Sequence, residues 1–91
     1  MNLVEWLFRN RRTGGITVVQ WPNAPLLAGI VVTAARWVFD PVGAWRTALD
    51  VAGTAAFAWW AADEVARGVN PWRRVLGGGV LVGLAVSWLR R

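Results

Sequence analysis

The sequence contains no cysteine, no histidine, no lysine and no tyrosine. Without cysteine the chain has no disulfide, no thiolate metal ligand and no thiol nucleophile. Without histidine it lacks the side chain that proteins use most often as a metal ligand and as a general base. These absences exclude the commonest kinds of catalytic and metal centre.

Other reactive groups are also scarce. Ser87 is the only serine, and neither histidine nor lysine is present to activate it. The one adjacent acidic pair, Asp63 and Glu64, would diverge by about 100° on a helix and would not face one another as an acid–base pair. A Mg²⁺ or Ca²⁺ site would need more oxygen ligands than Asn70 adds. We therefore expect a protein that is not an enzyme, with no catalytic residue, no bound metal and no cofactor.

Tryptophan and apolar residues are abundant instead, with eight tryptophans and 56% apolar residues in 91 positions. Indole has a large apolar body and one N–H donor, so it favours the boundary between lipid and water. Most of the tryptophans lie where apolar runs begin or end, which predicts aromatic belts at the membrane interface. These residues are Trp21, Trp37, Trp45, Trp59, Trp60, Trp72 and Trp88.

Three apolar segments, 21–39, 41–67 and 71–89, are accordingly predicted to be transmembrane helices in an up-down-up arrangement. Their connectors are so short that only tight hairpins fit between them. The sequence thus predicts an all-α, small integral membrane protein in which residues 1–91 form a single membrane domain. A water-exposed helical bundle is an alternative, because only residues 13–35 form an uncharged run of full spanning length. A signal peptide is an alternative interpretation of the first segment.

Caps and prolines support these boundaries. Asp40 before Pro41 is a typical N-cap followed by a proline in the first turn, and Asn70 before Pro71 repeats the pattern. Gly68 is expected to end the middle helix in the left-handed conformation.

The segment 2–12 is predicted to be a short amphipathic helix lying in the membrane interface. Asn2 and Glu5 occupy the positions of a capping box at its start. Arginines crowd its C-terminal end, where the helix dipole favours cations and anionic lipid headgroups would bind. They are Arg9, Arg11 and Arg12.

The net charge of +5 comes from ten arginines against five carboxylates. The arginines lie at the ends of apolar segments rather than in one stripe, which favours lipid headgroups and argues against nucleic acid. Six arginines fall on the amino-terminal side of the predicted membrane and four on the other. The positive-inside rule then predicts a cytoplasmic N-terminus in the cell membrane.

Charged residues recur at the i,i+4 spacing of helical ion pairs, and a polar cluster surrounds the second hairpin. The predicted pairs are Arg36–Asp40, Arg46–Asp50 and Asp63–Arg67. Arg46 and Asp50 lie inside the middle segment, so they form a candidate intramembrane charge pair. The cluster is either a solvated hairpin with internal ion pairs or a contact site for a partner or for headgroups. Its members are Asp63, Glu64, Arg67, Asn70, Arg73 and Arg74.

The last segment carries a glycine run that includes a GxxxG spacing, typical of close helix packing. This face could pack within the chain or against a partner. It consists of Gly77, Gly78, Gly79 and Gly83.

These features favour a non-catalytic accessory, assembly or stabilising subunit of a larger membrane complex, in contact with the lipid bilayer. The partner would be a membrane protein or further copies of the chain. One alternative is a homo-oligomeric pore or small transporter with Asp50 and Arg46 in its pathway. A second is a lipid-binding or membrane-active protein that uses the arginine- and tryptophan-rich N-terminal helix.

Overall fold

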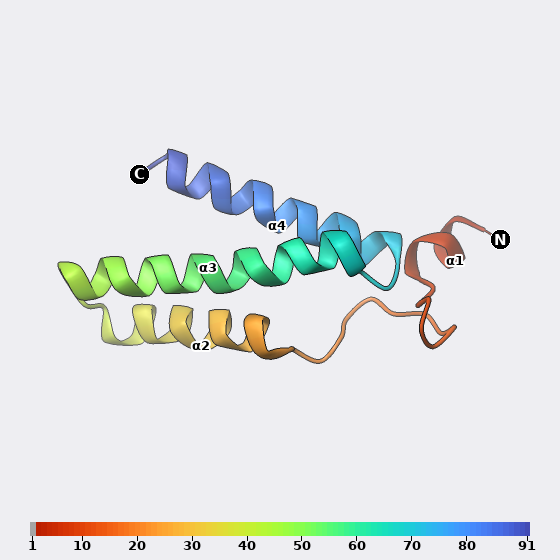
Figure 1. The fold of residues 1–91 in the computed structure, drawn as a ribbon, viewed down its shortest axis with the longest axis horizontal. Coiled ribbons are helices and arrows are strands. Elements are labelled where there is room, and N and C mark those ends of the chain that lie inside the picture. Colours follow the sequence, from red (N-terminus) through yellow and green to blue (C-terminus); the bar gives the residue numbers. More distant parts are fainter. Residues whose placement is uncertain (1) are drawn as a thin grey trace. The chain divides into compact units, whose positions relative to one another are not determined.

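The structure is a computed structural model that describes residues 2–91. The chain folds into helices (Figure 1). They are α1 (Leu3–Phe8), α2 (Ala24–Phe39), α3 (Ala44–Arg67) and α4 (Pro71–Leu89). Within the described residues the only β pairing is an isolated antiparallel bridge between Arg9 and Ile16. The prediction of an all-α fold is therefore confirmed. The chain divides into two compact units, residues 2–21 with 61–91, and residues 22–60.

None of the helices in residues 2–91 combines the length and the apolar run that crossing a bilayer requires. α2 has 16 residues, which is about 24 Å of helix against about 30 Å of hydrocarbon. α3 is longer but carries charged residues at several points along its length, and α4 has two arginines in its first turn. The predictions of three transmembrane helices, of an interfacial helix and of an integral protein of the cell membrane are wrong. The predicted orientation, with a cytoplasmic N-terminus, depended on these spanning helices and has no basis without them.

The helix boundaries differ from the predicted ones where a different residue makes the cap. α2 begins at Ala24 rather than at residue 21, because the side chain of Asn23 accepts a hydrogen bond from the Leu26 amide at 3.2 Å. Asp40 does not cap α3. It ends α2 in the left-handed conformation, with φ of 43°, and Gly43 follows with φ of 64°. These two positive φ angles reverse the chain within four residues.

The N-terminal helix is shorter than predicted, ending at Phe8 instead of residue 12. Its cap is the predicted one, because the Asn2 side chain accepts from the Glu5 amide at 2.8 Å. The chain then turns back on itself, so that Thr17 N–H donates to the Phe8 carbonyl at 2.7 Å. Gly14, with φ of 78°, lies in this turn. The hairpin replaces the last predicted turn of helix.

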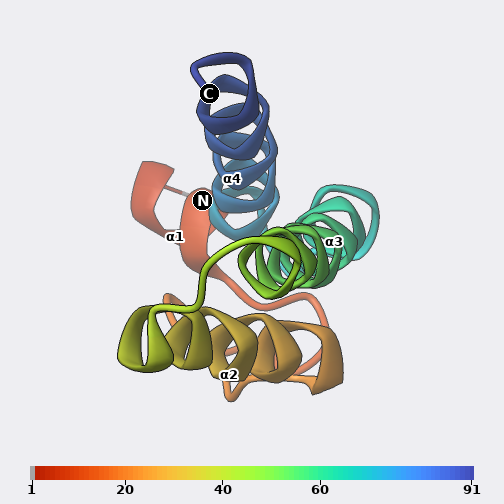
Figure 2. The same ribbon diagram turned by 90° about the vertical axis from the view of Figure 1, so that its left-hand side faces the viewer.

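Residues 22–60 form a helical hairpin of α2 and the first part of α3, joined by the short turn seen end-on in Figure 2. Glycines let the two helices approach. A Cβ at Gly29 would lie 2.9 Å from the Phe57 ring, and one at Gly53 would lie 3.4 Å from the Thr33 hydroxyl. These contacts run in opposite directions along the two helices, so the hairpin is antiparallel, as predicted.

In the other unit, residues 68–70 join the last residues of α3, 61–67, to α4, which packs against them. A Cβ at Gly77 would lie 2.6 Å from the Ala61 carbonyl oxygen, so α4 approaches the α3 backbone at this point. Gly68 does not adopt the predicted left-handed conformation. Glycine is needed there because a side chain would collide with the Glu64 carbonyl and with Arg74.

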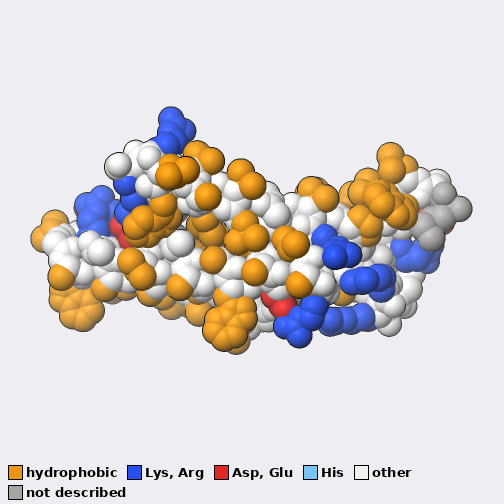
Figure 3. Space-filling view, turned by 45° about the horizontal axis from the view of Figure 1, so that its top comes forward, with side chains coloured by type: hydrophobic (Ala, Val, Ile, Leu, Met, Phe, Trp, Pro, Cys, Tyr) orange, Lys and Arg blue, Asp and Glu red, His pale blue; other side chains and the backbone are white. Residues whose placement is uncertain are grey.

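Few apolar side chains are buried. Among the described residues only Trp60, Ala61 and Val69 are buried hydrophobics, whereas large apolar side chains are exposed on every helix. The space-filling view shows hydrophobic side chains across the face in view (Figure 3). Because isolated exposed apolar residues are common but extended apolar faces are not, such faces point to contacts that the single chain does not make.

Candidate functional site

A hydrogen-bonded polar site surrounds the α3–α4 turn, in the unit formed by residues 2–21 and 61–91. We call it the polar junction: Glu64, Asn70, Arg73 and the backbone carbonyls that these side chains bind. Asn70 is 1% exposed, and Glu64 and Arg73 are buried beside it. Buried polar groups are stable only when hydrogen-bonded, and no buried side-chain N or O atom in the described residues lacks a partner.

Asn70 uses its whole side chain. Its Oδ1 accepts from the Arg73 amide at 2.8 Å, which is the N-cap of α4 predicted from the sequence. Its Nδ2 donates to the carbonyl oxygens of Phe8 at 2.9 Å and Thr17 at 2.8 Å. One residue therefore caps a helix and binds both arms of the N-terminal hairpin.

Arg73 completes the junction. Its Nε donates to Glu64 Oε2 at 3.2 Å, and both side chains are almost fully buried. Its Nη1 donates to the Val18 carbonyl at 3.2 Å. The same carbonyl accepts a second hydrogen bond from the Trp72 indole at 3.1 Å. The ion pair thus joins α3, α4 and the segment that follows the N-terminal hairpin.

Backbone contacts attach the same segment on its other side. The Arg11 amide donates to the Val69 carbonyl at 2.8 Å, and the Arg11 guanidinium donates to the Gly68 carbonyl. Phe8 and Trp72 lie in ring contact, with centroids 5.8 Å apart. This docking of residues 8–18 was not predicted, because no local pattern in a sequence indicates which distant carbonyls an asparagine will bind.

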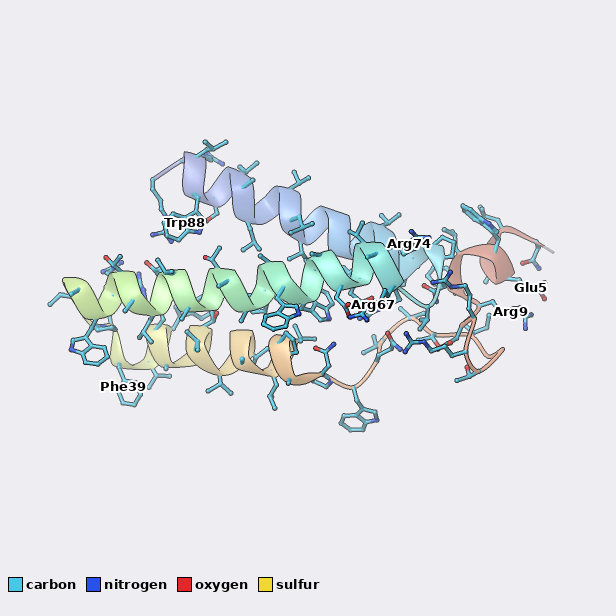
Figure 4. All side chains as sticks on the ribbon, viewed as in Figure 1. Glu5, Arg9, Phe39, Arg67, Arg74 and Trp88 are labelled. Carbon is cyan, nitrogen blue, oxygen red and sulfur yellow. The ribbon has the colours of Figure 1, made fainter. Side chains whose placement is uncertain are left out.

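The rest of the predicted polar cluster lies at the surface of the same turn, where Figure 4 labels Arg67 and Arg74. Arg67 Nε donates to Asp63 Oδ1 at 2.6 Å, the predicted i,i+4 pair. Arg74 Nε donates to the Val65 carbonyl at 2.8 Å rather than to one of the carboxylates of the predicted cluster. The six predicted residues therefore divide into a buried group and an exposed group.

Two of the three N-terminal arginines make side-chain contacts within the unit. Arg9 pairs with Glu5 at 3.3 Å and donates to the Gly14 carbonyl at 2.6 Å. Arg11 binds the α3–α4 turn, as described above. Arg12 is exposed.

The candidate charge pair Arg46–Asp50 is replaced by another pairing in the unit of residues 22–60. Asp50 Oδ1 accepts from Arg36 Nε at 3.0 Å, and both side chains are largely buried. Arg36 also reaches Asp40 at 3.5 Å, the predicted i,i+4 pair. Arg46 lies 3.9 Å from Asp40 at the surface. Asp50 is thus a contact between the two helices of the hairpin.

This pairing makes a stability prediction. Arg36→Gln should lower the free energy of unfolding by about 1 to 2 kcal/mol, because it removes a charged hydrogen bond from a largely buried carboxylate. Arg46→Gln, the matched control, should change it by less than about 0.5 kcal/mol, because its pair is exposed. Urea unfolding followed by circular dichroism measures both. Equal losses for the two variants would contradict the assignment.

The four glycines of α4 also separate into two groups. Gly77 packs against the α3 backbone, and a Cβ at Gly78 would lie 3.9 Å from Val65. Gly79 and Gly83 have nothing within 4 Å of the position that a Cβ would take. The first two therefore serve packing within the unit, and the other two face outward.

The tryptophans do not share one environment. Trp21, Trp37, Trp45 and Trp59 are at least 70% exposed, whereas Trp60 is buried. Trp72 binds the Val18 carbonyl, and the Arg91 guanidinium lies 4.0 Å from the Trp88 ring centroid. The predicted belts presupposed spanning helices, and no helix of the described residues is long and apolar enough to be one.

No family model, no curated protein and no solved structure matches this chain. Within residues 2–91 no group of three histidine, cysteine, aspartate or glutamate side chains is placed to hold a metal ion. Three features remain that could bind another molecule. They are the hydrogen-bonded arginines Arg9 and Arg11, the exposed apolar residues of α4, and the N-terminal segment that is hydrogen-bonded to the α3–α4 turn.

Proposed function

We propose that the protein is a non-catalytic helical subunit that assembles with a helix of a larger protein. The single observation that carries the proposal is the outward face of α4, which we call the α4 apolar face. Its residues recur at helical spacing and every one is exposed. They are Val75, Gly79, Val82, Gly83 and Val86.

The shape of this face favours a helix as the occupant. Gly79 and Gly83 lie one turn apart, and no atom of a neighbouring element comes within 4 Å of the position that a Cβ would take at either one. The side chains of Val75 and Val82 are both 64% exposed. A ridge of side chains from another helix would cover the valines and approach the α4 backbone at the glycines.

The burial pattern supports assembly as well. The chain buries few of its apolar side chains by itself, so a protein partner would remove further apolar surface from water, at about 25 cal/mol per Å². The structure does not favour a pore built on Arg46 and Asp50. Such a pore would require helices that cross a bilayer, and Asp50 contacts Arg36 instead.

Gly83→Ile tests the proposal. The substitution places a bulky side chain over the helix backbone at this face, and because isoleucine has a higher helix propensity than glycine it should not unfold α4. We expect at least a tenfold loss of the partner recovered with the tagged protein under native conditions, with the complex measured by light scattering after size exclusion. Ala85→Ile is the matched control, since it adds bulk to an exposed position about 200° further around the helix.

The outcomes separate clearly. Unchanged recovery with Gly83→Ile, or equal loss with Ala85→Ile, would contradict docking through this face. A discrete homo-oligomer that Gly83→Ile dissociates would replace the larger partner by a second copy of the chain.

A further inference from the structure

A pocket of about 370 Å³ lies between α1, the N-terminal hairpin and the start of α4, all within the unit of residues 2–21 and 61–91. Its volume falls in the range of small-molecule sites, about 300 to 1,000 Å³. Most of its lining is apolar, with a few charged groups. The residues that matter for recognition are Glu5, Trp6, Arg9, Arg11 and Pro71.

The charged part of the wall is held in place. Arg9 is fixed by Glu5 and by the Gly14 carbonyl, and Arg11 is fixed by the Gly68 carbonyl. A guanidinium has five N–H donors, and these contacts use two donors of Arg9 and one of Arg11. Figure 4 shows Glu5 and Arg9 side by side at α1. Two arginines against one glutamate leave a net positive wall.

The other parts of the lining add to this preference. Pro71 is the first residue of α4, a helix of 19 residues, so the positive end of the helix dipole lies at the pocket. Trp6 supplies an apolar ring that is 55% exposed. The pocket therefore presents fixed donors beside an apolar surface.

We propose that this pocket binds a phosphate ester with a short apolar chain. The phosphate would accept from Arg9 and Arg11 near the α4 terminus, and the chain would lie on Trp6 and Pro71. A phosphate offers three oxygens to these donors, one more than a carboxylate, and guanidinium groups bind it in a bidentate manner. The proposal does not depend on the assembly function, since the α4 apolar face is formed by other residues.

Hexyl phosphate is the probe, and nitrogen–proton NMR of the full chain is the measurement. The Trp6 indole and Gly14 amide signals should shift on titration. Hexyl phosphate should bind at least tenfold more tightly than inorganic phosphate or hexanol, because each of these lacks one half of the recognised group. The absence of saturable binding by hexyl phosphate would overturn the proposal.

Matched variants separate the pocket from general attraction to a basic chain. Arg9→Gln and Trp6→Ala should each weaken hexyl phosphate at least tenfold. Arg12→Gln removes the same charge outside the lining, and Trp21→Ala removes an exposed indole of the same unit, so neither should weaken it more than twofold. Equal weakening by test and control variants would overturn the site.

Vesicles distinguish the source of the phosphate ester. Phosphatidylcholine vesicles with and without phosphatidic acid are sedimented with the wild-type chain and with Arg9→Gln. Arg9-dependent binding to the acidic vesicles identifies a lipid headgroup. Hexyl phosphate binding without vesicle binding identifies a dissolved phosphate ester. If Gly83→Ile does not affect assembly, the proposed function is contradicted, but the hexyl phosphate and vesicle results still decide the proposal for this pocket.

Discussion

Glu64→Gln should lower the free energy of unfolding by about 3 to 5 kcal/mol, because it removes the carboxylate that pairs with the buried Arg73 guanidinium. The Arg73 and Glu64 side chains are 6% and 11% exposed, and their N–O distance is 3.2 Å. A loss of this size would be a large fraction of the stability of a chain of this length. Urea unfolding at neutral pH, followed by circular dichroism, measures it.

Two comparisons make the Glu64 result specific. Asp63→Asn removes the neighbouring carboxylate, whose partner Arg67 is exposed, and should cost no more than about 0.5 kcal/mol. The double variant Glu64→Met, Arg73→Met should recover much of the loss, because no charge then stays buried. The Val18 carbonyl would still accept from Trp72 in that variant. A double variant as unstable as Glu64→Gln would show that the ion pair is not the cause.

Local signals in the sequence predicted local structure well. The Asn70–Pro71 pair marks the start of α4, and Asn2 caps α1, because an N-cap depends only on a side chain and an amide three residues later. The Asp63–Arg67 pair follows from helical spacing alone. Asn23 would have been found by the same rule, since it precedes Pro25 at the start of an apolar run.

Contacts between different helices could not be predicted from these local signals. Helical spacing paired Asp50 with Arg46, but α2 brings Arg36 to it from 14 residues away. The Asp40–Pro41 motif resembled a helix start, although the tight reversal to α3 places Asp40 in the left-handed region instead. Both errors arise because the partner of a charged or capping group depends on tertiary packing.

The membrane prediction failed for a related reason. Tryptophan at the ends of apolar runs is compatible with a lipid boundary, but it is equally compatible with an exposed ring on a short helix. Trp21 lies before α2 begins, so residues 21–23 of the predicted span are not helical. The 16-residue helix that remains is too short to cross a bilayer. In α2 the cap at Asn23 makes the helix shorter than the apolar pattern predicted. In α3 and α4, which are longer, charged residues interrupt the apolar run instead.

The glycine run of α4 shows the same limit, because sequence spacing treats its members alike. A Cβ on Gly77 would lie 2.6 Å from the Ala61 carbonyl oxygen and 2.8 Å from Glu64 Cβ. A Cβ on Gly79 would meet nothing within 4 Å. Gly77 and Gly79 are thus only two residues apart in the sequence, yet the first contacts α3 closely and the second is open.

Gly77→Ala and Gly79→Ala should consequently change stability in opposite directions. Gly77→Ala should lower the free energy of unfolding by about 2 to 3 kcal/mol, because backbone atoms of α3 must move to admit the methyl group. Gly79→Ala should raise it by up to about 1 kcal/mol, the helix-propensity difference between alanine and glycine. The two variants make the same chemical change on the same helix, so chemical denaturation compares the sites directly. Equal stabilisation by both would mean that α4 does not approach α3 at Gly77, and the polar junction beside that contact would need a different geometry.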